Sequence, residues 1–239
     1  MGQMITDIVA KDEEARIVAG IDPFTGKEQE YPVFASLKEC DVKADAMIDF
    51  SSAVGVEERI DYAIKKQIPL VECSTGLSKE QTDYLLDAGK KVAILRSANM
   101  SVGVNLLIKL LKEASQKLAS EGFDIEIVEK HHNQKLDAPS GTALALADAI
   151  NEANDEQYEY VYDRSQVRQK RGNKELGISA VRGGTIVGDH DVIFAGEDEV
   201  VTFSHRAYSR AVFAKGSVVA AKYMKGKGAG LYDMADVLL

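Results

Sequence analysis

The chain has 239 residues, 45% of them hydrophobic and 28% charged, which is typical of a globular protein with one large or two modest domains. Its formal net charge is −9, and no basic tract stands out, so we do not expect a nucleic-acid partner. No apolar run reaches the length of a membrane span, and no signal peptide is recognisable. Cys40 and Cys73 lack metal-ligand spacing and are typical of buried thiols in a reducing cytoplasm.

The first half of the chain alternates short apolar strands with amphipathic helices. This alternation predicts an α/β domain with a parallel sheet that is covered on both faces. The expected helices are residues 1–12, 54–66, 79–89 and 101–120, and the expected strands are residues 16–21, 46–50, 69–73 and 92–95.

The second half predicts a different architecture. Longer strands joined by glycine-bearing turns indicate a mixed or antiparallel sheet, and therefore an α+β domain. We expect a first domain of residues 1–101 with 211–239 and a second of residues 102–210. The expected strands are residues 123–128, 175–181, 185–194 and 199–205, the helices are residues 142–153, 209–224 and 233–238, and residues 151–173 are expected to form a mobile loop.

Asp22 follows the predicted strand 16–21 and stands where Rossmann-type dinucleotide-binding domains place an acid that binds the adenosine ribose. The alternative is a simple turn residue in Asp22-Pro23. The strand and glycine loop that precede such an acid are absent, so we expect the protein to start about ten to fifteen residues upstream. No arginine follows Asp22 to bind a 2′-phosphate, which favours NADH over NADPH, although Lys27 could reduce this preference.

Residues 129–150 read EKHHNQKLDAPSGTALALADAI. Adjacent side chains on a strand point to opposite faces, so His131 and His132 are poorly placed to share a metal ion, and no third ligand has a suitable spacing. We therefore expect no metal. The alternative to a functional role is a pair of surface histidines at a strand end.

Ser140-Gly141-Thr142 opens the predicted helix, where backbone N–H groups can bind an anion. Taken alone, this segment could be an ordinary helix cap. With Lys135 and the histidines nearby, however, it forms a cationic site in an acidic protein, which suits a small dicarboxylate. Histidine is also the side chain best suited to donate a proton near neutral pH.

The segment EKHHNQKLDAPSGTAL resembles the signature of the bacterial 4-hydroxy-tetrahydrodipicolinate (dihydrodipicolinate) reductase family, which is close to E-x-H-H-x-x-K-x-D-x-P-S-G-T-A. The resemblance extends over essentially the whole chain. It continues in CSTGLS (residues 73–78), SANMSVGVN (97–105), RGGTIVGDHDVIF (182–194), SHRAYSR (204–210) and GLYDMADVL (230–238).

The resemblance implies an enzyme of diaminopimelate and lysine synthesis that reduces a cyclic dicarboxylic imine with NAD(P)H. By motif, His131 matches the proton donor and Lys135 its catalytic partner. The matching substrate-binding residues are His132, Ser140, Gly141, Thr142 and Arg210. The resemblance also implies a homotetramer formed through the sheet of the second domain, which is thus the substrate-binding and tetramerisation domain.

The same resemblance implies cofactor contacts in the first, NAD(P)H-binding domain. Asp22 matches the ribose-binding acid, and Met1 matches the last residue of a G-x-x-G-x-M loop whose glycines are missing. Many family members have arginine at the position of Pro23, which again favours NADH here. The remaining matches are Cys73, Ser74, Thr75, Ser97, Ala98, Asn99 and Met100.

Two other functions remain open at this stage. A non-catalytic paralogue that binds a dicarboxylate or a nucleotide fits the missing glycine loop, but not the intact set of His131, His132 and Lys135. A two-domain dehydrogenase with another carbonyl or imine substrate predicts the loss of the dicarboxylate-binding residues, which are present.

Overall fold

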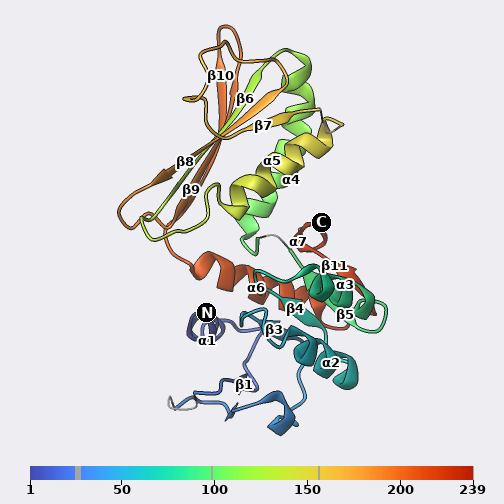
Figure 1. Ribbon diagram of the computed structural model, residues 1–239. Helices are drawn as coiled ribbons and strands as arrows, with labels where there is room; N and C mark the ends of the chain where they lie inside the picture. Colours follow the sequence, from blue (N-terminus) through green and yellow to red (C-terminus); the bar gives the residue numbers. More distant parts are fainter. Residues whose placement is uncertain (25–27, 98, 156, 239) are drawn as a thin grey trace. The chain divides into compact units, whose positions relative to one another are not determined.

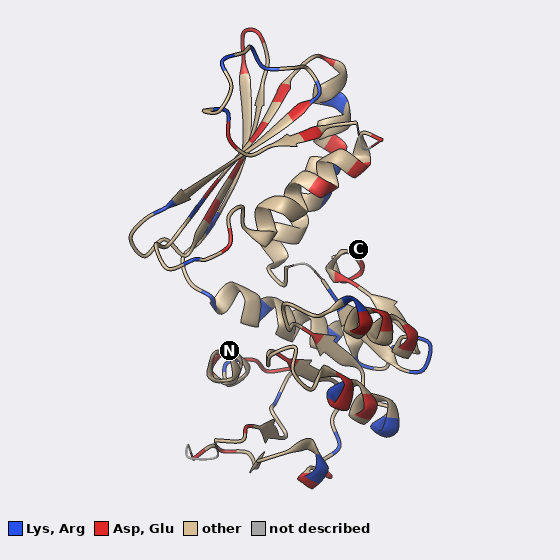
Figure 2. Ribbon diagram, viewed as in Figure 1, with Lys and Arg blue, Asp and Glu red and all other residues tan. Residues whose placement is uncertain are grey.

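The computed structural model describes residues 1–24, 28–97, 99–155 and 157–238 (Figure 1). The chain divides into two compact units. Unit 1 comprises Met1–Ser101 and Ala211–Leu239, and unit 2 comprises Val102–Arg210. Acidic and basic residues are intermixed on the elements of both units (Figure 2).

The centre of unit 1 is a parallel four-stranded sheet with the order β11-β5-β4-β3. The sequence-based prediction of a parallel α/β sheet is therefore confirmed. The register aligns Asp49 with Glu72 and Glu72 with Arg96, so three charged residues end neighbouring strands at the same edge. The strands are β3 (Met47–Asp49), β4 (Leu70–Glu72), β5 (Ala93–Arg96) and β11 (Gly230–Tyr232).

Helices cover this sheet because its strands are apolar on both faces. Leu70 and Val71 are both fully buried although they point to opposite sides of β4. Helices α2 (Val56–Lys66) and α3 (Lys79–Ala88) share a core with Leu70, while α6 (Ala211–Met224) contacts β3, β4 and β5. Helix α1 (Gly2–Val9) packs against α6, and the short elements η1 (Leu37–Glu39) and α7 (Met234–Val237) complete the unit.

A two-stranded parallel sheet lies apart from the main sheet of unit 1. It pairs β1 (Gly20–Ile21) with β2 (Val33–Phe34). The predicted strand 16–21 is thus confirmed only at its end, because residues 16–19 form no strand ladder. Strand β2 was not predicted, since two residues are too few for an alternating pattern to be visible.

Unit 2 is built on a mixed five-stranded sheet with the order β10-β9-β6-β8-β7, as the sequence predicts. Strand β6 runs parallel to β8 and antiparallel to β9, while β10 is antiparallel to β9 and β7 is parallel to β8. The strands are β6 (Asp124–His131), β7 (Glu159–Val161), β8 (Glu175–Arg182), β9 (Gly188–Ala195) and β10 (Val200–Ala207).

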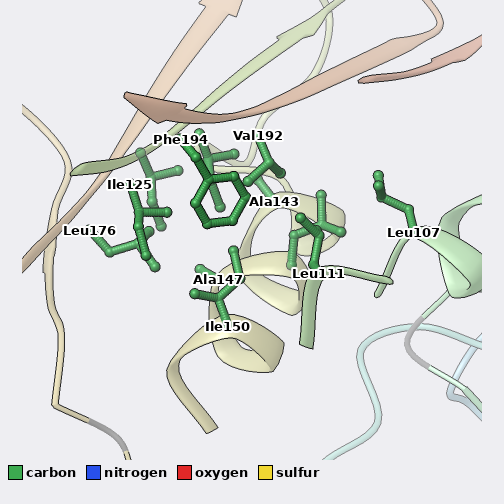
Figure 3. Close-up of a cluster of buried hydrophobic side chains, with 12 residues drawn as sticks. Leu107, Leu111, Ile125, Ala143, Ala147, Ile150, Leu176, Val192 and Phe194 are labelled. Carbon is green, nitrogen blue, oxygen red and sulfur yellow. The ribbon is translucent and has the colours of Figure 1, made fainter. Parts of the chain in front are cut away.

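Helices α4 (Val102–Ser120) and α5 (Gly141–Ala153) lie side by side on one side of this sheet (Figure 1). Every second residue of β6 and β9 faces them, and Figure 3 shows the resulting core, in which Phe194 and Ile125 meet Ala147 and Leu111. Burying each large apolar side chain stabilises the fold by about 1.5–3 kcal/mol. This core fixes α5 against β6, next to the end of β6 where its buried residues become polar.

Three predictions about unit 2 and the end of the chain need correction. Strand β6 continues three residues beyond the predicted end at residue 128, and its last residue is His131. The segment 151–173 was expected to be a mobile loop, but it contains the end of α5 and the strand β7. No strand was expected between the helices 209–224 and 233–238, but Gly230–Tyr232 pairs with β5 as β11.

Candidate active site

The candidate site of unit 2 begins where β6 changes from apolar to polar. The residues of β6 that face the helices are Ile125, Ile127, Glu129 and His131, so the last two carry the alternation beyond the apolar core. Glu129 pairs with His190 on β9 in the antiparallel ladder. The first turn of α5 covers this end of the strand, because the backbone N–H of Ser140 donates to Glu129 at 2.9 Å.

Glu129 is fully buried, and both of its carboxylate oxygens are hydrogen-bonded within the protein. Arg182 donates to both of its carboxylate oxygens, at 2.7 Å each, and Nδ1 of His131 lies 2.6 Å from Oε2. Burial alone raises the pKa of Glu129, but the hydrogen bonds from Arg182, His131 and the Ser140 N–H outweigh it and hold that pKa below its usual value. Glu129 is therefore ionised at neutral pH.

His131 is only 8% exposed, and its two ring nitrogens have different surroundings. Nδ1 is engaged by Glu129, whereas Nε2 has no hydrogen-bond partner among the described residues. Gly188 borders Nε2, since a Cβ atom at this glycine would lie 3.0 Å from it. A side chain at position 188 would therefore crowd the free nitrogen.

Ser140 links the helix to the sheet. Its hydroxyl caps α5 by accepting from the Ala143 N–H at 3.1 Å, and it lies 3.0 Å from Nε2 of His190. Ser140 is almost completely buried. Its N–H and its hydroxyl, which the sequence predicted to bind substrate, are instead hydrogen-bonded within the protein.

His190 is a buried neutral histidine. Its ring meets the ring of His131 edge-on at 5.1 Å between centroids. Burial, reinforced by the neighbouring His131, lowers the pKa of His190 to about 4. His205 faces it across the β9–β10 ladder, and Nδ1 of each ring is buried without a hydrogen-bond partner in the described structure.

Lys135 and His132 lie in the loop between β6 and α5. Nζ of Lys135 contacts both carboxylate oxygens of Asp137, at 2.7 and 2.9 Å, and this pairing lowers the pKa of Asp137. His132 follows the last residue of β6, so the strand-based argument about opposite faces does not apply to it. Its ring is half-buried and hydrogen-bonds to no described residue.

The remaining predicted substrate residues lie at the same end of the unit 2 sheet. Gly141 is exposed and begins α5, and a Cβ atom there would meet nothing within 4 Å. Thr142 follows it and is half-buried. Arg210 is exposed and comes three residues after Ala207, which pairs with Gly188 in the ladder. An anion at the positive end of α5 thus has room beside Gly141.

The predicted cofactor loops of unit 1 follow β4 and β5. Ser74, Thr75 and Ser97 line one cavity of about 610 Å³. The Ser74 hydroxyl is buried without a partner in the described structure, and burial raises the pKa of the Cys73 thiol. Gly216 of α6 lies so close to the carbonyl of Met100 that any Cβ atom would clash, so this glycine permits the packing of α6 against the loop after β5.

The other predicted cofactor residues are not brought to this cavity. Met1 precedes α1, and Asp22 is exposed after β1, where its Oδ1 accepts from the Phe24 N–H at 2.9 Å. Asn99 is buried, and its Oδ1 accepts from the Ser101 N–H at 2.8 Å. Ala98 and Lys27 lie outside the described residues.

Four residues of the site were not assigned roles from the sequence: Glu129, Arg182, Gly188 and His190. Glu129 could have been found from its spacing, because it lies two residues before His131 and therefore shares its face of the strand. Arg182, Gly188 and His190 come from other strands, and only the pairing of β8 and β9 with β6 brings them close.

Among the described residues, no group of three or more histidine, cysteine, aspartate or glutamate side chains is arranged to hold a metal ion. No helix of the described part of the chain has both the length and the apolar character that a membrane span requires.

A parallel sheet covered by helices, with polar loops at the carboxyl ends of its strands, is the class of fold that binds dinucleotides, and here it is joined in sequence to a second, mixed-sheet unit. Family models narrow this class. Residues 1–100 match the model described as dihydrodipicolinate reductase, N-terminus, and residues 103–238 match dihydrodipicolinate reductase, C-terminus. The chain belongs to the dihydrodipicolinate reductase family.

Curated relatives agree with this assignment. The 4-hydroxy-tetrahydrodipicolinate reductase of Caldanaerobacter subterraneus subsp. tengcongensis is 50% identical over 238 residues, which span 100% of this chain and 94% of the relative. The enzyme of the same name from Clostridium tetani is 47% identical over 238 residues, spanning 100% of this chain and 92% of the relative.

Solved structures share the fold. A dipicolinate-bound dihydrodipicolinate reductase from Paenisporosarcina sp. TG-14 matches with a TM-score of 0.78 and 24% identity, covering 100% of this chain and 95% of that one. A probable dehydrogenase from Thermotoga maritima matches with a TM-score of 0.65 and 14% identity, covering 99% of this chain and 89% of that one.

Proposed function

We propose that this chain reduces 4-hydroxy-tetrahydrodipicolinate, through the dihydrodipicolinate formed from it by loss of water, to tetrahydrodipicolinate with a hydride from NAD(P)H and a proton, in the diaminopimelate and lysine pathway. The observation that carries the proposal is the His131 ring, whose Nδ1 is engaged by Glu129 while its Nε2 stays free beside Gly188. Family membership supplies the substrate, and this geometry supplies a proton donor for it.

Unit 2 binds the two carboxylate groups of the substrate. The first turn of α5 at Gly141 and Thr142 offers N–H groups and the positive end of the helix dipole, while Lys135, Arg210 and His132 add cationic or polar groups at the same end of the sheet. Lys135 exchanges its present partner, Asp137, for a substrate carboxylate. Ser140 contributes chiefly by holding this turn against Glu129.

His131 protonates the substrate from Nε2. Nδ1 is engaged by Glu129, so Nε2 is the ring nitrogen left to face the substrate. Lys135 stabilises the negative charge that develops on the substrate as the reduction proceeds.

Unit 1 binds the cofactor, which supplies the hydride when bound. The loops after β4 and β5 fit this role, since they line one cavity and the buried Ser74 hydroxyl still has an unfilled hydrogen-bonding capacity. We assign Cys73, Ser74 and Thr75 with Ser97, Asn99 and Met100 to the nicotinamide end. Asp22 we assign to the adenosine ribose, and NADH is the preferred cofactor because Pro23, rather than an arginine that could bind a 2′-phosphate, follows Asp22.

We further propose that the protein acts in the cytoplasm as a homotetramer. Cys40 and Cys73 are not joined by a disulfide, which agrees with that compartment. The sheet face of unit 2 opposite α4 and α5 is the proposed subunit contact, and it carries exposed apolar side chains such as Val181 and Val200.

The direct test supplies the purified chain with 4-hydroxy-tetrahydrodipicolinate and, in separate assays, with NADH or NADPH. The proposal predicts substrate-dependent loss of NADH absorbance and formation of tetrahydrodipicolinate. Lys135→Ala should lower kcat about a hundredfold, and Lys112→Ala, which breaks an exposed ion pair with Glu152, is the matched control. No substrate-dependent oxidation of NADH or NADPH would refute the proposal.

A further inference from the structure

Glu129 is the one carboxylate of the site that is fully buried, among the described residues, and no substrate-binding role accounts for it. Both of its oxygens are occupied within the protein, Oε1 by Arg182 and the Ser140 N–H and Oε2 by Arg182 and His131. A buried charge is costly unless it is paired and hydrogen-bonded in this way. Glu129 is therefore built into the site rather than left available to a ligand.

We propose that Glu129, locked in its ionised form by Arg182, is a positioning residue that forces His131 to deliver its proton from Nε2. The proposal rests on the function proposed above, in which His131 is the proton donor. It adds the group that selects which ring nitrogen works and that keeps the ring in place.

The geometry around Glu129 explains why the selection is complete. Arg182 approaches as a fork with both terminal nitrogens at 2.7 Å, and a guanidinium does not lose its proton in proteins. Glu129 therefore remains an acceptor whether or not substrate is bound, and Nδ1 of His131 must donate to it. Arg182 is itself fixed, because its Nη2 also donates to the Asp137 carbonyl at 2.6 Å.

The remaining neighbours of His131 cannot perform this selection. His190 touches the ring edge-on, but it is neutral and its Nε2 faces Ser140. Gly188 has no side chain to offer. At the start of α5, the N–H of Ser140 donates to Glu129 and its hydroxyl lies beside His190, and both groups are uncharged.

The alternative explanation is that Arg182 and Glu129 form only a structural ion pair between β8 and β6. Both explanations predict lower stability when the pair is broken. Only the positioning role predicts a change in the state of the His131 ring and a loss of turnover that depends on His131.

The first experiment records the ¹⁵N spectrum of the histidine rings in the full chain, which contains four histidines. His131→Gln assigns the resonances of His131. The proposal predicts a hydrogen on Nδ1 of His131 in the neutral ring, and a neutral ring protonated on Nε2 would overturn it without any variant of Glu129 having to fold.

The second experiment is a double-mutant cycle. Glu129→Gln keeps the shape but removes the charge, and it should lower kcat about a hundredfold or more while the loss falls mainly on kcat rather than KM. In the His131→Gln background the same change should cost almost nothing more, because Glu129 acts through His131. Glu152→Gln, in the same unit, is the matched control for removing an ion-paired carboxylate.

The outcomes separate this proposal from the function on which it rests. The positioning role would be overturned if the two losses of kcat multiplied in the Glu129→Gln, His131→Gln double mutant. It would also be overturned if a folded Glu129→Gln protein had wild-type turnover. Wild-type turnover in His131→Gln would instead overturn the proton donor itself. Arg182→Lys, which keeps a cation beside Glu129, should retain more turnover than Arg182→Met, and equal loss in both would contradict the charge lock.

Discussion

The hydroxyl of Ser140 and Nε2 of His190 lie 3.0 Å apart, which ties the first turn of α5 to strand β9. The same hydroxyl accepts from the Ala143 N–H, and the Ser140 N–H donates to Glu129. One residue thus joins the helix end proposed to bind carboxylates to the strand that carries the proposed proton donor.

We therefore expect Ser140→Ala to lower both stability and substrate affinity. Loss of the helix cap should cost about 1 kcal/mol of unfolding free energy. Nε2 of His190 would also lose its partner, the Ser140 hydroxyl, which adds to this cost. Denaturant unfolding and KM measure the two effects. Ser78→Ala removes the cap of α3 in unit 1 and should lower stability without raising KM for the substrate. An unchanged KM in Ser140→Ala would contradict the link.

Gly188→Ala should impair turnover through crowding. The added methyl group would lie 3.0 Å from Nε2 and 3.4 Å from Cδ2 of His131, so the ring must move away from its present position. Small displacements of a catalytic group can cost on the order of a hundredfold in rate. Gly183→Ala, where a Cβ atom meets nothing within 4 Å, is the control. Steady-state kinetics on both proteins would show equal kcat values if the space beside Nε2 were unimportant.

Cofactor preference should follow Asp22. Its carboxylate is exposed after β1 and would repel a 2′-phosphate, so NADH should bind more tightly than NADPH in isothermal titration. Asp22→Ser should reduce this difference, chiefly by weakening NADH and relieving the repulsion of NADPH. Tighter binding of NADPH by the unmodified chain would show that Asp22 is not the ribose-binding acid.

Stability should depend on pH through Glu72. Burial, with a contribution from the neighbouring Asp49, raises the pKa of Glu72 to about 7. An unfolded glutamate titrates near pH 4.3, so between that value and pH 7 the folded state binds more protons than the unfolded state. Glu72 therefore destabilises the fold increasingly as pH rises through this range.

Glu72→Gln removes this titration. The variant should gain stability relative to the unmodified chain as pH rises from about 5 to 7, by an amount on the order of 2 kcal/mol. Denaturant unfolding at several pH values measures the difference. A difference that stays constant with pH would show that Glu72 titrates normally.

Much of the fold could be predicted because most of its helices and strands leave a pattern in neighbouring residues of the sequence. The period of β6, the apolar faces of α4 and α5 and the alternation in unit 1 each depend on neighbouring residues, and those elements formed within a few residues of the expected bounds. Strands β2, β7 and β11 were not predicted, since they owe their strand geometry to pairing with another strand, which no local pattern contains.

The candidate site was predicted in part for the same reason. His131, Lys135 and the Ser140–Thr142 turn occupy one continuous segment, so a motif reveals them together. Arg182, which binds Glu129, and His190, which pairs with it in the ladder, lie on strands about fifty to sixty residues farther along the chain. Their role follows from the register of β8 and β9 on β6, which no local spacing contains.

The most direct test of the account is the steady-state turnover of His131→Gln compared with the unmodified chain. If Nε2 of His131 donates the proton, kcat should fall by about two or more orders of magnitude, because positioned acids contribute on that scale. NADH affinity, measured by titration, should stay nearly unchanged, since His131 belongs to unit 2 and the predicted cofactor residues belong to unit 1. Turnover equal to that of the unmodified chain would contradict the account.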